Sequence, residues 1–439
     1  MRPVILFVLA MHGVSALSAQ QVKHIILVSI DGFRPDFYLD EKWPAPNLQY
    51  LAKHGAGSEG VNGVFPSVTY PSHTTIISGV PPATHGVFYN TPVEPLGATG
   101  LWNSDYKVIT SETIWDAAKR AGMTTASVSW PVSIGAPVDY NIPEAFILEN
   151  PLDRRIPTSK FSTPAGLFEE VQQKATGEMQ AIDLNINHSK IDENLGRIAA
   201  YLFKTYRPAL TTLHLPGVDH AQHSEGREGD HVKFAIANAD RVIGSLLETI
   251  NLSDMKDSTA IIITGDHGFV TVKKRFSPNI LLANAGLLDE KPGPGRKWKA
   301  MFQATGGSAF LRLKDSTDKQ TLNKVRALLN NLPDSIRSMY RVVEKAELKK
   351  IGADPYAEFA LAAKNNISMN AATTGDLVAN AKGGTHGYFP DFQEIRTGFV
   401  GYGAGFSNGA NPAPKNLTDI APLVAKLLNL NFSAGKLRK

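Results

Sequence analysis

The sequence of 439 residues contains no cysteine. Disulfide bonds and thiolate metal ligands are therefore excluded, and any bound metal ion must be held by Asp, Glu or His side chains. The sequence also lacks an uninterrupted apolar run of about 20 residues, the length that a membrane-spanning helix requires. We therefore expect no stable insertion into a membrane.

An excess of charge of one sign is also absent. There are 45 Lys and Arg residues against 41 Asp and Glu residues, so the formal net charge is only +4. The basic residues are scattered, and no basic run carries interleaved aromatic residues, which argues against a nucleic acid polymer as the partner. The composition, 43% hydrophobic and 20% charged, is typical of a globular protein. The length fits one large α/β domain with insertions, or two to three smaller domains.

The first twenty residues differ from the rest of the chain. Arg2 precedes VILFVLAMHGV, an apolar stretch too short to span a membrane, and the small residues SALSAQ follow. This order predicts a secretory signal peptide over residues 1–19, cleaved after Ala19 or Ala16, and a mature domain over 20–439; a buried amino-terminal strand is the alternative. An exported chain without cysteine is compatible with the bacterial periplasm, so we expect a secreted protein that is periplasmic if the host is a Gram-negative bacterium.

Three apolar runs end in an acidic residue. HIILVSID ends at Asp31, ALTTLHLPGVD at Asp219 and STAIIITGD at Asp266. Short runs rich in Ile, Val, Leu and Thr indicate buried strands of a mostly parallel sheet, and helical patterns lie between them. These patterns cover 111–122, 191–206 and 231–250. The alternation predicts an α/β fold in which the three acids meet at the carboxyl ends of the strands, where ligands gather.

The pattern changes between about 290 and 380. KPGPGRKWK indicates a loop, SAFLRLK a strand and DKQTLNKVRALLNNL a helix. The glycine-rich segment GGTHGYFP follows at 383–390. We therefore expect a small α+β lobe, at about 290–380, inserted into the main domain.

The stretch PSVTYPSHTTIISG predicts a helix that begins at Pro71 and stops at Gly79. Thr69 would then lie at or just before the N-cap, near free N–H groups and the positive end of the helix dipole. Thr69 is either a simple cap or a nucleophile directed at an anion, because helix N-termini bind phosphate. A nucleophilic hydroxyl needs activation, and no base lies next to Thr69 in the sequence.

Several Asp and His residues have spacings that suit metal ligands. Asp219 and His223 are four residues apart, so one helical turn places them on one face. Asp266 and His267 follow a strand and are flanked by glycines, and His386 lies in another glycine-rich loop. Mixed oxygen and nitrogen ligands of this kind suit zinc or a similar divalent ion. The candidate set is Asp31, Thr69, Asp219, His223, Asp266, His267 and His386, whereas His73 and His85 are interpreted as structural.

Together these motifs resemble the nucleotide pyrophosphatase/phosphodiesterase branch of the alkaline phosphatase superfamily. The resemblance begins at VSIDGFRPDF and continues through FPSVTYPSHTTIISGVPPATHGVFYN and ETIWDAAKRAGMTTASVSWPVS. LPGVDHAQHSEG, TGDHGF and GGTHGYFP follow in the order of the family. The resemblance implies an alkaline-phosphatase-like three-layer sandwich around a mostly parallel sheet.

The resemblance also implies two zinc ions per chain. One would be held by Asp31, Thr69, Asp266 and His267, and the other by Asp219, His223 and His386. Asn90 matches the position whose amide helps to hold a phosphoryl oxygen, together with the backbone N–H after Thr69. The implied reaction is attack of a metal-activated Thr69 on phosphorus, departure of the leaving group from the second metal, and cleavage of the resulting phosphothreonine by water.

The implied substrate is a small phosphodiester, with a nucleotide as the expected case. Related phosphomonoesterases place a cation over the extra charge of a monoester, and SVSWPVSIGAPVDY at 127–140 contains no Lys or Arg. WPVS resembles the WPG segment of the phosphodiesterase branch. Tyr70 occupies the position where the family places an aromatic or apolar residue that can stack on a nucleobase; ordinary core packing is the alternative.

Other reactions remain open from the sequence. TYPSH replaces the commoner TFPNH, so a glycerol or lysophospholipid diester is an alternative substrate. A phosphomonoesterase or phosphonate hydrolase on the same scaffold is a second alternative. The absence of a Cys/Ser-x-Pro-x-Arg segment argues against a sulfatase, and the intact ligand set argues against a non-catalytic metal-binding protein.

Overall fold

The computed structural model describes residues 21–146, 150, 153–186, 188–406 and 411–438. The predicted signal peptide, residues 1–19, lies outside the described residues. Within the described part of the chain, no helix is both long and apolar enough to cross a bilayer.

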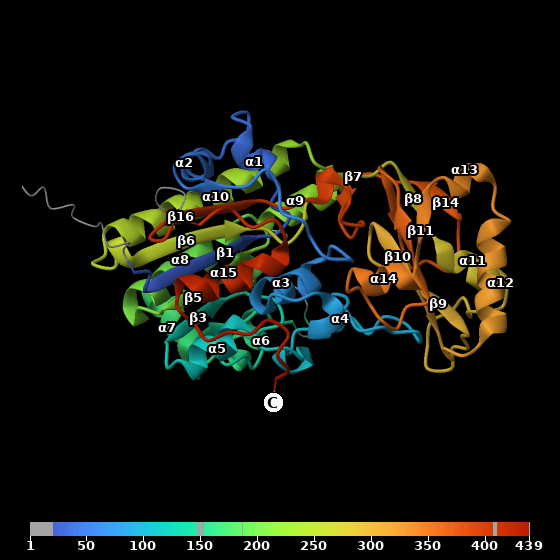
Figure 1. The fold of residues 1–439 in the computed structure, drawn as a ribbon, viewed down its shortest axis with the longest axis horizontal. Coiled ribbons are helices and arrows are strands. Elements are labelled where there is room, and N and C mark those ends of the chain that lie inside the picture. Colours follow the sequence, from blue (N-terminus) through green and yellow to red (C-terminus); the bar gives the residue numbers. More distant parts are fainter. Residues whose placement is uncertain (1–20, 147–149, 151–152, 187, 407–410, 439) are drawn as a thin grey trace, which may run out of the picture.

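The larger lobe is organised around a mostly parallel sheet (Figure 1). In sheet order, its described strands are β2 (Ala56–Gly57), β16 (Phe399–Gly403), β6 (Thr259–Thr264), β1 (His24–Ile30), β5 (Leu210–Leu215), β3 (Thr125–Val128) and β4 (Tyr140–Ile142). The strands from β6 to β4 are parallel, whereas β16 and β2 form an antiparallel edge. The three apolar runs of the sequence are β1, β5 and β6, which are neighbours at the centre of the sheet. The prediction of an α/β fold is confirmed.

Helices cover both faces of this sheet. They are α1 (Asp36–Leu39), α2 (Pro46–His54), α3 (Thr69–Ser78), α4 (Pro82–His85), α5 (Ile114–Arg120), α6 (Arg155–Phe161), α7 (Leu167–Val171), α8 (Lys190–Tyr206), α9 (Gly217–Glu225), α10 (Asp230–Asn251) and α15 (Ile420–Leu427). The predicted helical patterns correspond to α5, α8 and α10. In α5, the hydroxyl of Thr113 accepts the N–H of Asp116 and the Asp116 carboxylate accepts the N–H of Thr113, so the helix begins after Thr113.

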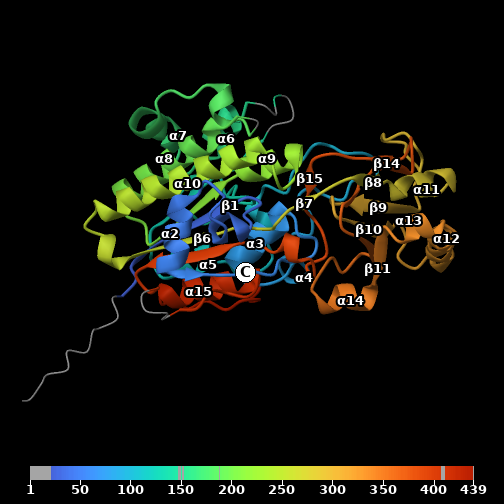
Figure 2. The same cartoon turned by 90° about the horizontal axis from the view of Figure 1, so that it is seen from above.

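The side chains of β1 alternate between two hydrophobic cores, as expected for a strand that is buried on both faces. Ile26, Val28 and Ile30 pack with residues of α2, α8 and α10. Ile25 and Leu27 point to the opposite face and pack with residues of α3, α5 and α15. In Figure 2, α8 and α10 accordingly lie on one side of the sheet and α5 and α15 on the other. The domain is therefore a three-layer α/β/α sandwich.

A second, smaller lobe follows β6 in the chain and lies at one end of the molecule in Figures 1 and 2. Its elements are β8 (Lys274–Phe276), α11 (Pro278–Asn284), β9 (Ala300–Ala304), β10 (Ser308–Leu313), α12 (Lys319–Asn330), α13 (Asp334–Arg337), β11 (Tyr340–Glu344), α14 (Lys345–Lys350), β12 (Phe359–Ala363), β13 (Ile367–Met369) and β14 (Val378–Asn380). Its largest sheet has the antiparallel order β11-β12-β10-β9. The strand and the helix predicted within 290–380 correspond to β10 and α12.

The connection between the lobes places two predicted ligands together. The chain enters the smaller lobe through β7 (Val270–Thr271) and returns through β15 (Gly384–Thr385), and these two strands pair antiparallel. His267 lies just before β7 and His386 just after β15, so the insertion brings the two histidines close together. Their imidazole rings stack with centroids 3.8 Å apart.

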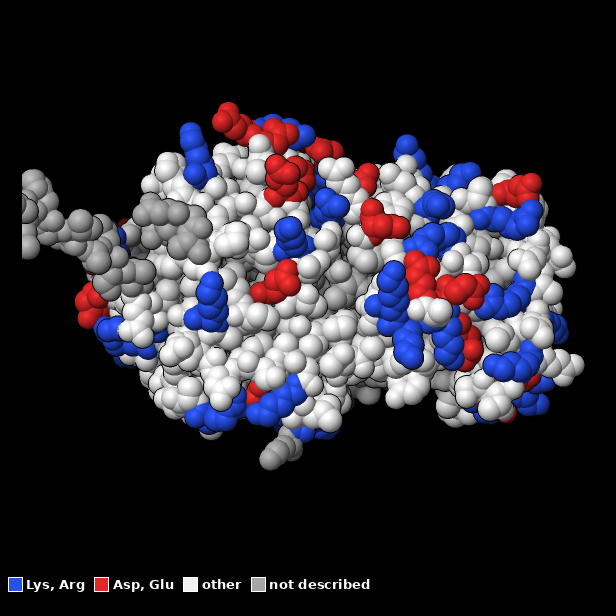
Figure 3. Space-filling model, in the orientation of Figure 1, with Lys and Arg blue, Asp and Glu red and all other residues white. Residues whose placement is uncertain are grey.

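The surface seen in Figure 3 carries charges of both signs. Lys and Arg side chains alternate with Asp and Glu side chains over both lobes, and a mixed cluster of them lies over the smaller lobe. On this face the basic side chains do not join into a continuous band.

Candidate metal centre

Three carboxylates meet at the carboxyl end of the central sheet. Asp31 directly follows β1, and Asp266 lies two residues beyond β6. Asp219 lies in the first turn of α9, which begins two residues after β5. Because β1 pairs with both β5 and β6, the three carboxylates converge as the strand order predicts. All three are buried, with Asp266 completely removed from solvent.

Three histidines approach these carboxylates in the same orientation. His223, His267 and His386 each place Nδ1 at hydrogen-bond distance from a backbone carbonyl and leave Nε2 for the cluster. The carbonyl oxygens are those of Gly384 at 3.1 Å, Gly268 at 3.1 Å and Ser67 at 3.2 Å, respectively. A backbone partner of this kind fixes the ring and its tautomer in metal-binding histidines. The three imidazoles therefore present Nε2 to the carboxylates.

The ligand atoms form two compact groups, in each of which they lie within 4.8 Å of one another. One group contains Asp31, Asp266 and His267, and the other contains Asp219, His267 and His386. His267 is shared, but only its Nε2 is available, and this atom lies 3.0 Å from Asp266 Oδ2 and 3.4 Å from Asp31 Oδ1. His267 therefore belongs with the first pair.

His223 lies beside the second group. Its Nε2 lies 3.3 Å from Asp219 Oδ2, while His386 Nε2 lies 3.6 Å from Asp219 Oδ1. The His223 side chain is 42% exposed, so this group borders solvent, whereas the first group is closed. The structure thus brings together all six Asp and His residues that the sequence predicts.

Several buried atoms of this cluster have no hydrogen-bond partner. They are Asp31 Oδ1, Asp219 Oδ1, Asp266 Oδ2 and His267 Nε2. Buried polar atoms are normally paired, because an unpaired one costs the free energy of its desolvation. Here three carboxylates and an imidazole nitrogen converge without a partner. The donor set consists of hard oxygen and imidazole ligands, which fits divalent zinc.

The pKa values of these groups are strongly perturbed. Burial, together with the neighbouring Asp266 and Asp219 carboxylates, raises the pKa of Asp31 well above its usual value. Burial also opposes ionisation of Asp266, but His267 outweighs it and holds the pKa of Asp266 below its usual range. Burial, with His267 and His223 nearby, lowers the pKa of His386. A neutral imidazole is the form that binds a metal.

Thr69 is the first residue of α3 and not its cap. The N-cap is Val68, and Pro71 is the third helical residue, so the helix begins two residues earlier than predicted. The reason is that the N–H groups of a whole first turn lack helical acceptors, so a proline at its third position costs no hydrogen bond. The predicted end is confirmed, since Gly79 adopts the left-handed conformation with φ 68°.

Thr69 is 8% exposed and is held beside the carboxylates through its own helix. Its backbone carbonyl accepts a hydrogen bond from His73 Nδ1 at 2.8 Å, and the same nitrogen lies 3.7 Å from Asp266 Oδ2. Two residues before Thr69, the Ser67 carbonyl meets His386. The threonine therefore lies between residues tied to both ligand groups.

Asn90 contacts the same helix start. Its Oδ1 accepts the backbone N–H of Tyr70 at 2.9 Å. The sequence led us to expect that this N–H and the Asn90 amide would both serve an anion. In the structure the N–H is used by Asn90, and the amide nitrogen of Asn90 is the remaining donor.

A family model adds independent information to this geometry. Residues 25–389 match the model described as type I phosphodiesterase / nucleotide pyrophosphatase. The chain belongs to this family. The match spans β1 to His386 and so includes every candidate ligand.

The chain is similar to several characterised members of this family. It is 23% identical over 419 residues to ectonucleotide pyrophosphatase/phosphodiesterase family member 1 of Homo sapiens, covering 92% of this chain and 40% of the relative. It is 24% identical over 422 residues to the venom phosphodiesterase CdcPDE of Crotalus durissus collilineatus, covering 92% and 44%. The chain therefore spans about half the length, or less, of the curated relatives it matches.

Solved structures of family members share the fold. Human ectonucleotide pyrophosphatase/phosphodiesterase 5 matches with a TM-score of 0.67 at 19% identity, covering 93% of this chain and 96% of that one. The murine protein, solved as an inactive Thr-to-Ala variant in complex with AMP, matches with a TM-score of 0.67 at 20% identity, covering 94% and 96%. The alkaline-phosphatase-like α/β fold expected from the sequence is confirmed.

Two buried histidines beside the cluster were not predicted from the sequence as site residues. His214, in β5, places Nε2 3.1 Å from Asp31 Oδ2 and Nδ1 3.0 Å from the Ser129 carbonyl. His73 contacts His214 edge-on, with ring centroids 4.6 Å apart. Burial, followed by His214, lowers the pKa of His73 to about 3, so this ring is neutral. The i, i+4 spacing of Thr69 and His73 was the signal that marks His73.

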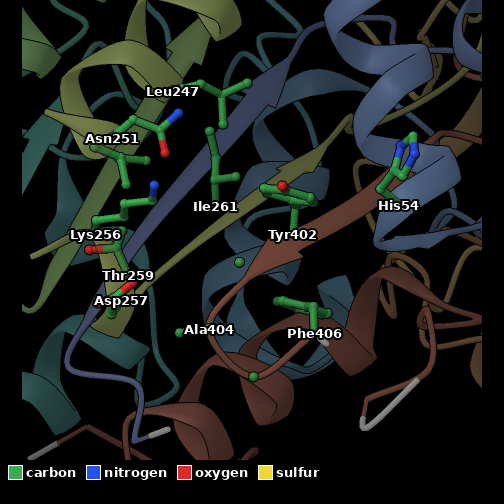
Figure 4. A pocket seen from close by; sticks show the side chains of 13 residues that line it. His54, Leu247, Asn251, Lys256, Asp257, Thr259, Ile261, Tyr402, Ala404 and Phe406 are labelled. Atoms are coloured by element: carbon green, nitrogen blue, oxygen red, sulfur yellow. The ribbon is translucent and has the colours of Figure 1, made fainter. Parts of the chain in front are cut away.

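The cavity drawn in Figure 4 is separate from the candidate metal centre. Its volume is about 340 Å³, and its walls include Leu247, Thr259, Ile261 and Tyr402. Thr259 begins β6, whereas Asp266 follows the other end of that strand. The cavity therefore opens at the amino end of the strand, away from the carboxylates, and it contributes none of the unpaired buried atoms described above.

Proposed function

We propose that this chain is a two-zinc phosphodiesterase that hydrolyses a small phosphodiester through a covalent ester of Thr69. The observation that carries the proposal is the group of unpaired, buried carboxylate and imidazole atoms beside the start of α3. Three ionised carboxylates this close together need a cation to compensate them, and otherwise one of them takes up a proton. The family match supports the same reaction class.

Two ligand sets would hold the metal ions. One consists of Asp31, Thr69, Asp266 and His267, and the other of Asp219, His223 and His386. When bound, the ions supply Lewis acidity, which lowers the pKa of a coordinated hydroxyl or water and stabilises charge on the attacking and leaving oxygens.

The chain's own residues then carry out a double displacement. The Thr69 Oγ attacks phosphorus, its bond to phosphorus forms, and the bond between phosphorus and the leaving oxygen breaks. The organic group that remains on phosphorus is held as a diester of Thr69. The Asn90 amide, fixed through Tyr70 N–H, donates to a phosphoryl oxygen. Water cleaves the Thr69 ester in the second displacement and restores the hydroxyl.

A nucleotide is the proposed substrate class. The murine structural relative was solved with AMP in a Thr-to-Ala variant described as inactive, which supports both a nucleotide ligand and an essential threonine. The relatives are named as ectoenzymes or venom enzymes, which supports export of this chain as well. The predicted signal peptide over residues 1–19 and a periplasmic location are part of the proposal.

A diester is favoured over a monoester by the charges near Tyr70. The cation there, Arg154, is 8% exposed, and its Nη1 lies 3.6 Å from Glu144 Oε1. Glu144 therefore compensates Arg154, and the guanidinium is not free to balance the second negative charge of a phosphomonoester.

The experiment compares hydrolysis of bis-p-nitrophenyl phosphate with that of p-nitrophenyl phosphate, with and without zinc. We expect zinc-dependent turnover with strong preference for the diester, and loss of turnover after chelation or in Thr69→Ala. The Thr69→Ala protein should retain its zinc, because all six Asp and His ligands remain when the hydroxyl is removed. Preference for the monoester would replace the proposal with a phosphomonoesterase, and substantial turnover by Thr69→Ala would remove Thr69 as the nucleophile.

A further inference from the structure

We infer that Tyr89 is a positioning residue: its contact with Asp354 of the smaller lobe fixes the place of the neighbouring Asn90 amide in the site. The inference rests on the proposed function, because it concerns the side chain that would hold a phosphoryl oxygen. It gives the smaller lobe a part in the reaction, since Asp354 lies between α14 and β12. Neither Tyr89 nor Asp354 was selected from the sequence as a site residue.

The Tyr89 ring is buried in a hydrophobic core of the smaller lobe. Tyr89 is 3% exposed, and it packs edge-on against Phe310 of β10, with ring centroids 5.4 Å apart. The same core contains residues of β11, α14 and β12. Tyr89 itself belongs to the segment that follows α4 in the larger lobe. The ring therefore anchors a segment of one lobe in the other.

The hydroxyl of Tyr89 ends on a buried ion pair. It donates to Oδ2 of Asp354, a completely buried residue, and the same oxygen lies 2.6 Å from Arg312 Nη2. Asp354 Oδ1 accepts the N–H of Tyr356 at 2.9 Å. Burial, followed by the Asp354 carboxylate, raises the pKa of Tyr89 well above its usual value, so the hydroxyl keeps its proton and donates. Hydrogen bonds to an ionised acceptor are among the stronger ones, so this contact holds the phenol in one place.

A second contact attaches the same segment to the smaller lobe. The N–H of Ala83, in α4, donates to the Gly352 carbonyl at 2.8 Å, two residues before Asp354. Gly352 has a φ of 67°, and a Cβ there would lie 2.5 Å from the Pro81 side chain, so this approach requires glycine. In Figures 1 and 2, α4 and α14 accordingly lie side by side. The segment from Pro81 to Tyr89 is therefore held near both of its ends.

Asn90 begins where this anchored segment ends. Its Oδ1 accepts the N–H of Tyr70 at 2.9 Å, which sets the direction of the amide. The carbonyls of Tyr89 and Asn90 accept hydrogen bonds from Asn103, at 2.7 Å from its side chain and 2.9 Å from its backbone. Loss of the Tyr89 hydroxyl removes an anchor only one residue from the amide. Misplacement of a catalytic group by about 1 Å can cost about 10²-fold in rate, so a smaller shift is measurable.

The test is a double-mutant cycle on the zinc-loaded protein, with bis-p-nitrophenyl phosphate as the substrate. Asn90→Ala alone should lower kcat by about 10²-fold or more, the loss typical of one donor to a charged oxygen. Tyr89→Phe keeps the ring in its core and should lower kcat by about tenfold, a part of that loss. In the Asn90→Ala background the same substitution should change kcat by less than about twofold, because the group that it positions is gone. Asp354→Asn should show the same dependence on Asn90.

Tyr106→Phe is the matched control. Tyr106 is 1% exposed, and its hydroxyl donates to Asp116 Oδ2 at 2.7 Å within the larger lobe. Its substitution also removes a buried hydroxyl from a carboxylate, so it should lower the unfolding temperature about as much as Tyr89→Phe does. The kcat of Tyr106→Phe should stay within about twofold of the wild type, because no contact leads from its hydroxyl to Asn90.

An equal fall in kcat for Tyr89→Phe with and without Asn90 would overturn the inference, because a general loss of structure acts in both backgrounds. An unchanged kcat in Tyr89→Phe would overturn it as well and leave the proposed function intact. Wild-type kcat in Asn90→Ala would contradict the assignment of Asn90 as a phosphoryl ligand, and the inference with it. No zinc-dependent turnover by the wild type would instead contradict the proposed function itself.

Discussion

On one side of Thr69 lie carboxylates and imidazoles that follow strands or short turns. On the other side lies a row of aromatic rings, in which Trp102 contacts Tyr70 of α3 and Phe146, with ring centroids 5.2 Å and 5.6 Å apart. The metal side consists of Asp31, Asp219, His223, Asp266, His267 and His386, and the aromatic side of Tyr70, Trp102 and Phe146 with Glu144 and Arg154. The sheet fixes the metal side, because neighbouring parallel strands deliver their ends to one place. The aromatic side depends on the start of α3 and on the loops that carry Trp102 and Phe146. If the proposed function holds, the sheet carries the reacting groups and the loops are the variable part of the site.

Removing a carboxylate of the metal side should have the largest effect on turnover. Asp266→Ala removes the contact of Asp266 Oδ2 with His267 in the first ligand group, and the acceptor Oδ1 of the Gly32 N–H. We expect loss of about one zinc per chain and a fall in turnover of about 10³-fold or more, because the site acts as a unit. Elemental analysis and p-nitrophenol release measure both. Asp254→Ala, at a carboxylate that is 73% exposed, is the control.

Retention of both zinc ions by Asp266→Ala would contradict the assignment of Asp266 as a ligand. Loss of both ions with a normal unfolding temperature would show that the two groups bind cooperatively, and the separation into two ligand sets would be wrong.

His214 should have a smaller effect on the same side, because it acts through Asp31. Its Nε2 lies 3.1 Å from Asp31 Oδ2, and partners of this kind typically change metal affinity by about 10- to 100-fold. We expect His214→Ala to weaken zinc binding by this amount in a chelator competition, and His214→Gln to restore part of it. His85→Ala is the matched control: His85 is equally buried, its pKa is lowered by burial to about 3, and its nitrogens meet Thr75 and Val87. Equal zinc affinity in all three variants would rule out a positioning role for His214.

His214, compared with the residues that were predicted, shows which site residues sequence patterns reveal and which they do not. Asp31 and Asp266 were predicted because each ends an apolar run, and Asp219 with His223 because of the helical spacing. His214 lies inside such a run, in a strand buried on both faces, so no periodicity separates it from the core. Its register opposite Ser29, one residue before the end of β1, is what places it at the cluster. That pairing follows only from the folded sheet.

The aromatic side was less accessible to prediction than the metal side. Tyr70 was selected because it follows Thr69, but Trp102, Glu144 and Arg154 lie in segments without a periodic pattern. Trp102 reaches Tyr70 because the loop after Asn90 returns to it, where the N–H of Asn103 donates to the Asn90 carbonyl at 2.9 Å. This is a contact between backbone groups that side-chain identity does not encode. Pro71 gave a misleading helix start for a related reason, since proline is accepted throughout the first turn.

A substitution on the aromatic side should change stability more than turnover. Tyr70→Phe keeps the ring and removes the hydroxyl that donates to Glu144. We expect the free energy of unfolding to fall by about 1–3 kcal/mol, the range for a buried hydrogen bond to a charged group. The value of kcat/KM for the p-nitrophenyl ester of thymidine monophosphate should change by less than about fivefold. Denaturant titration and steady-state kinetics measure these quantities, and a loss of turnover comparable to that of Asp266→Ala would abolish the distinction between the two sides.

Asp192 should affect turnover least, although it supports the start of α9. Burial raises the pKa of Asp192 to about 7, and the N–H of Gly217 only partly opposes this. Because the unfolded chain releases this proton at a pH of about 3.9, the group stabilises the fold at low pH, and this stabilisation is lost as the pH rises towards 7. The wild type should lose on the order of 4 kcal/mol over this window, from this group alone. Asp192→Asn should lose correspondingly less between pH 4 and pH 8 in denaturant titrations.

Turnover of Asp192→Asn at pH 7 should stay within about twofold of the wild type, since its amide still accepts the Gly217 N–H. An identical pH dependence of stability in the two proteins would contradict the buried, protonated state of Asp192.

The most direct test of the central claim is the stereochemical course at phosphorus. A chiral phosphorothioate analogue of the thymidine p-nitrophenyl ester is hydrolysed in isotopically labelled water, and the configuration of the product is determined. Each in-line displacement inverts phosphorus, so attack by Thr69 followed by attack of water predicts net retention. Net inversion would show that water attacks the diester directly and that Thr69 is not the nucleophile.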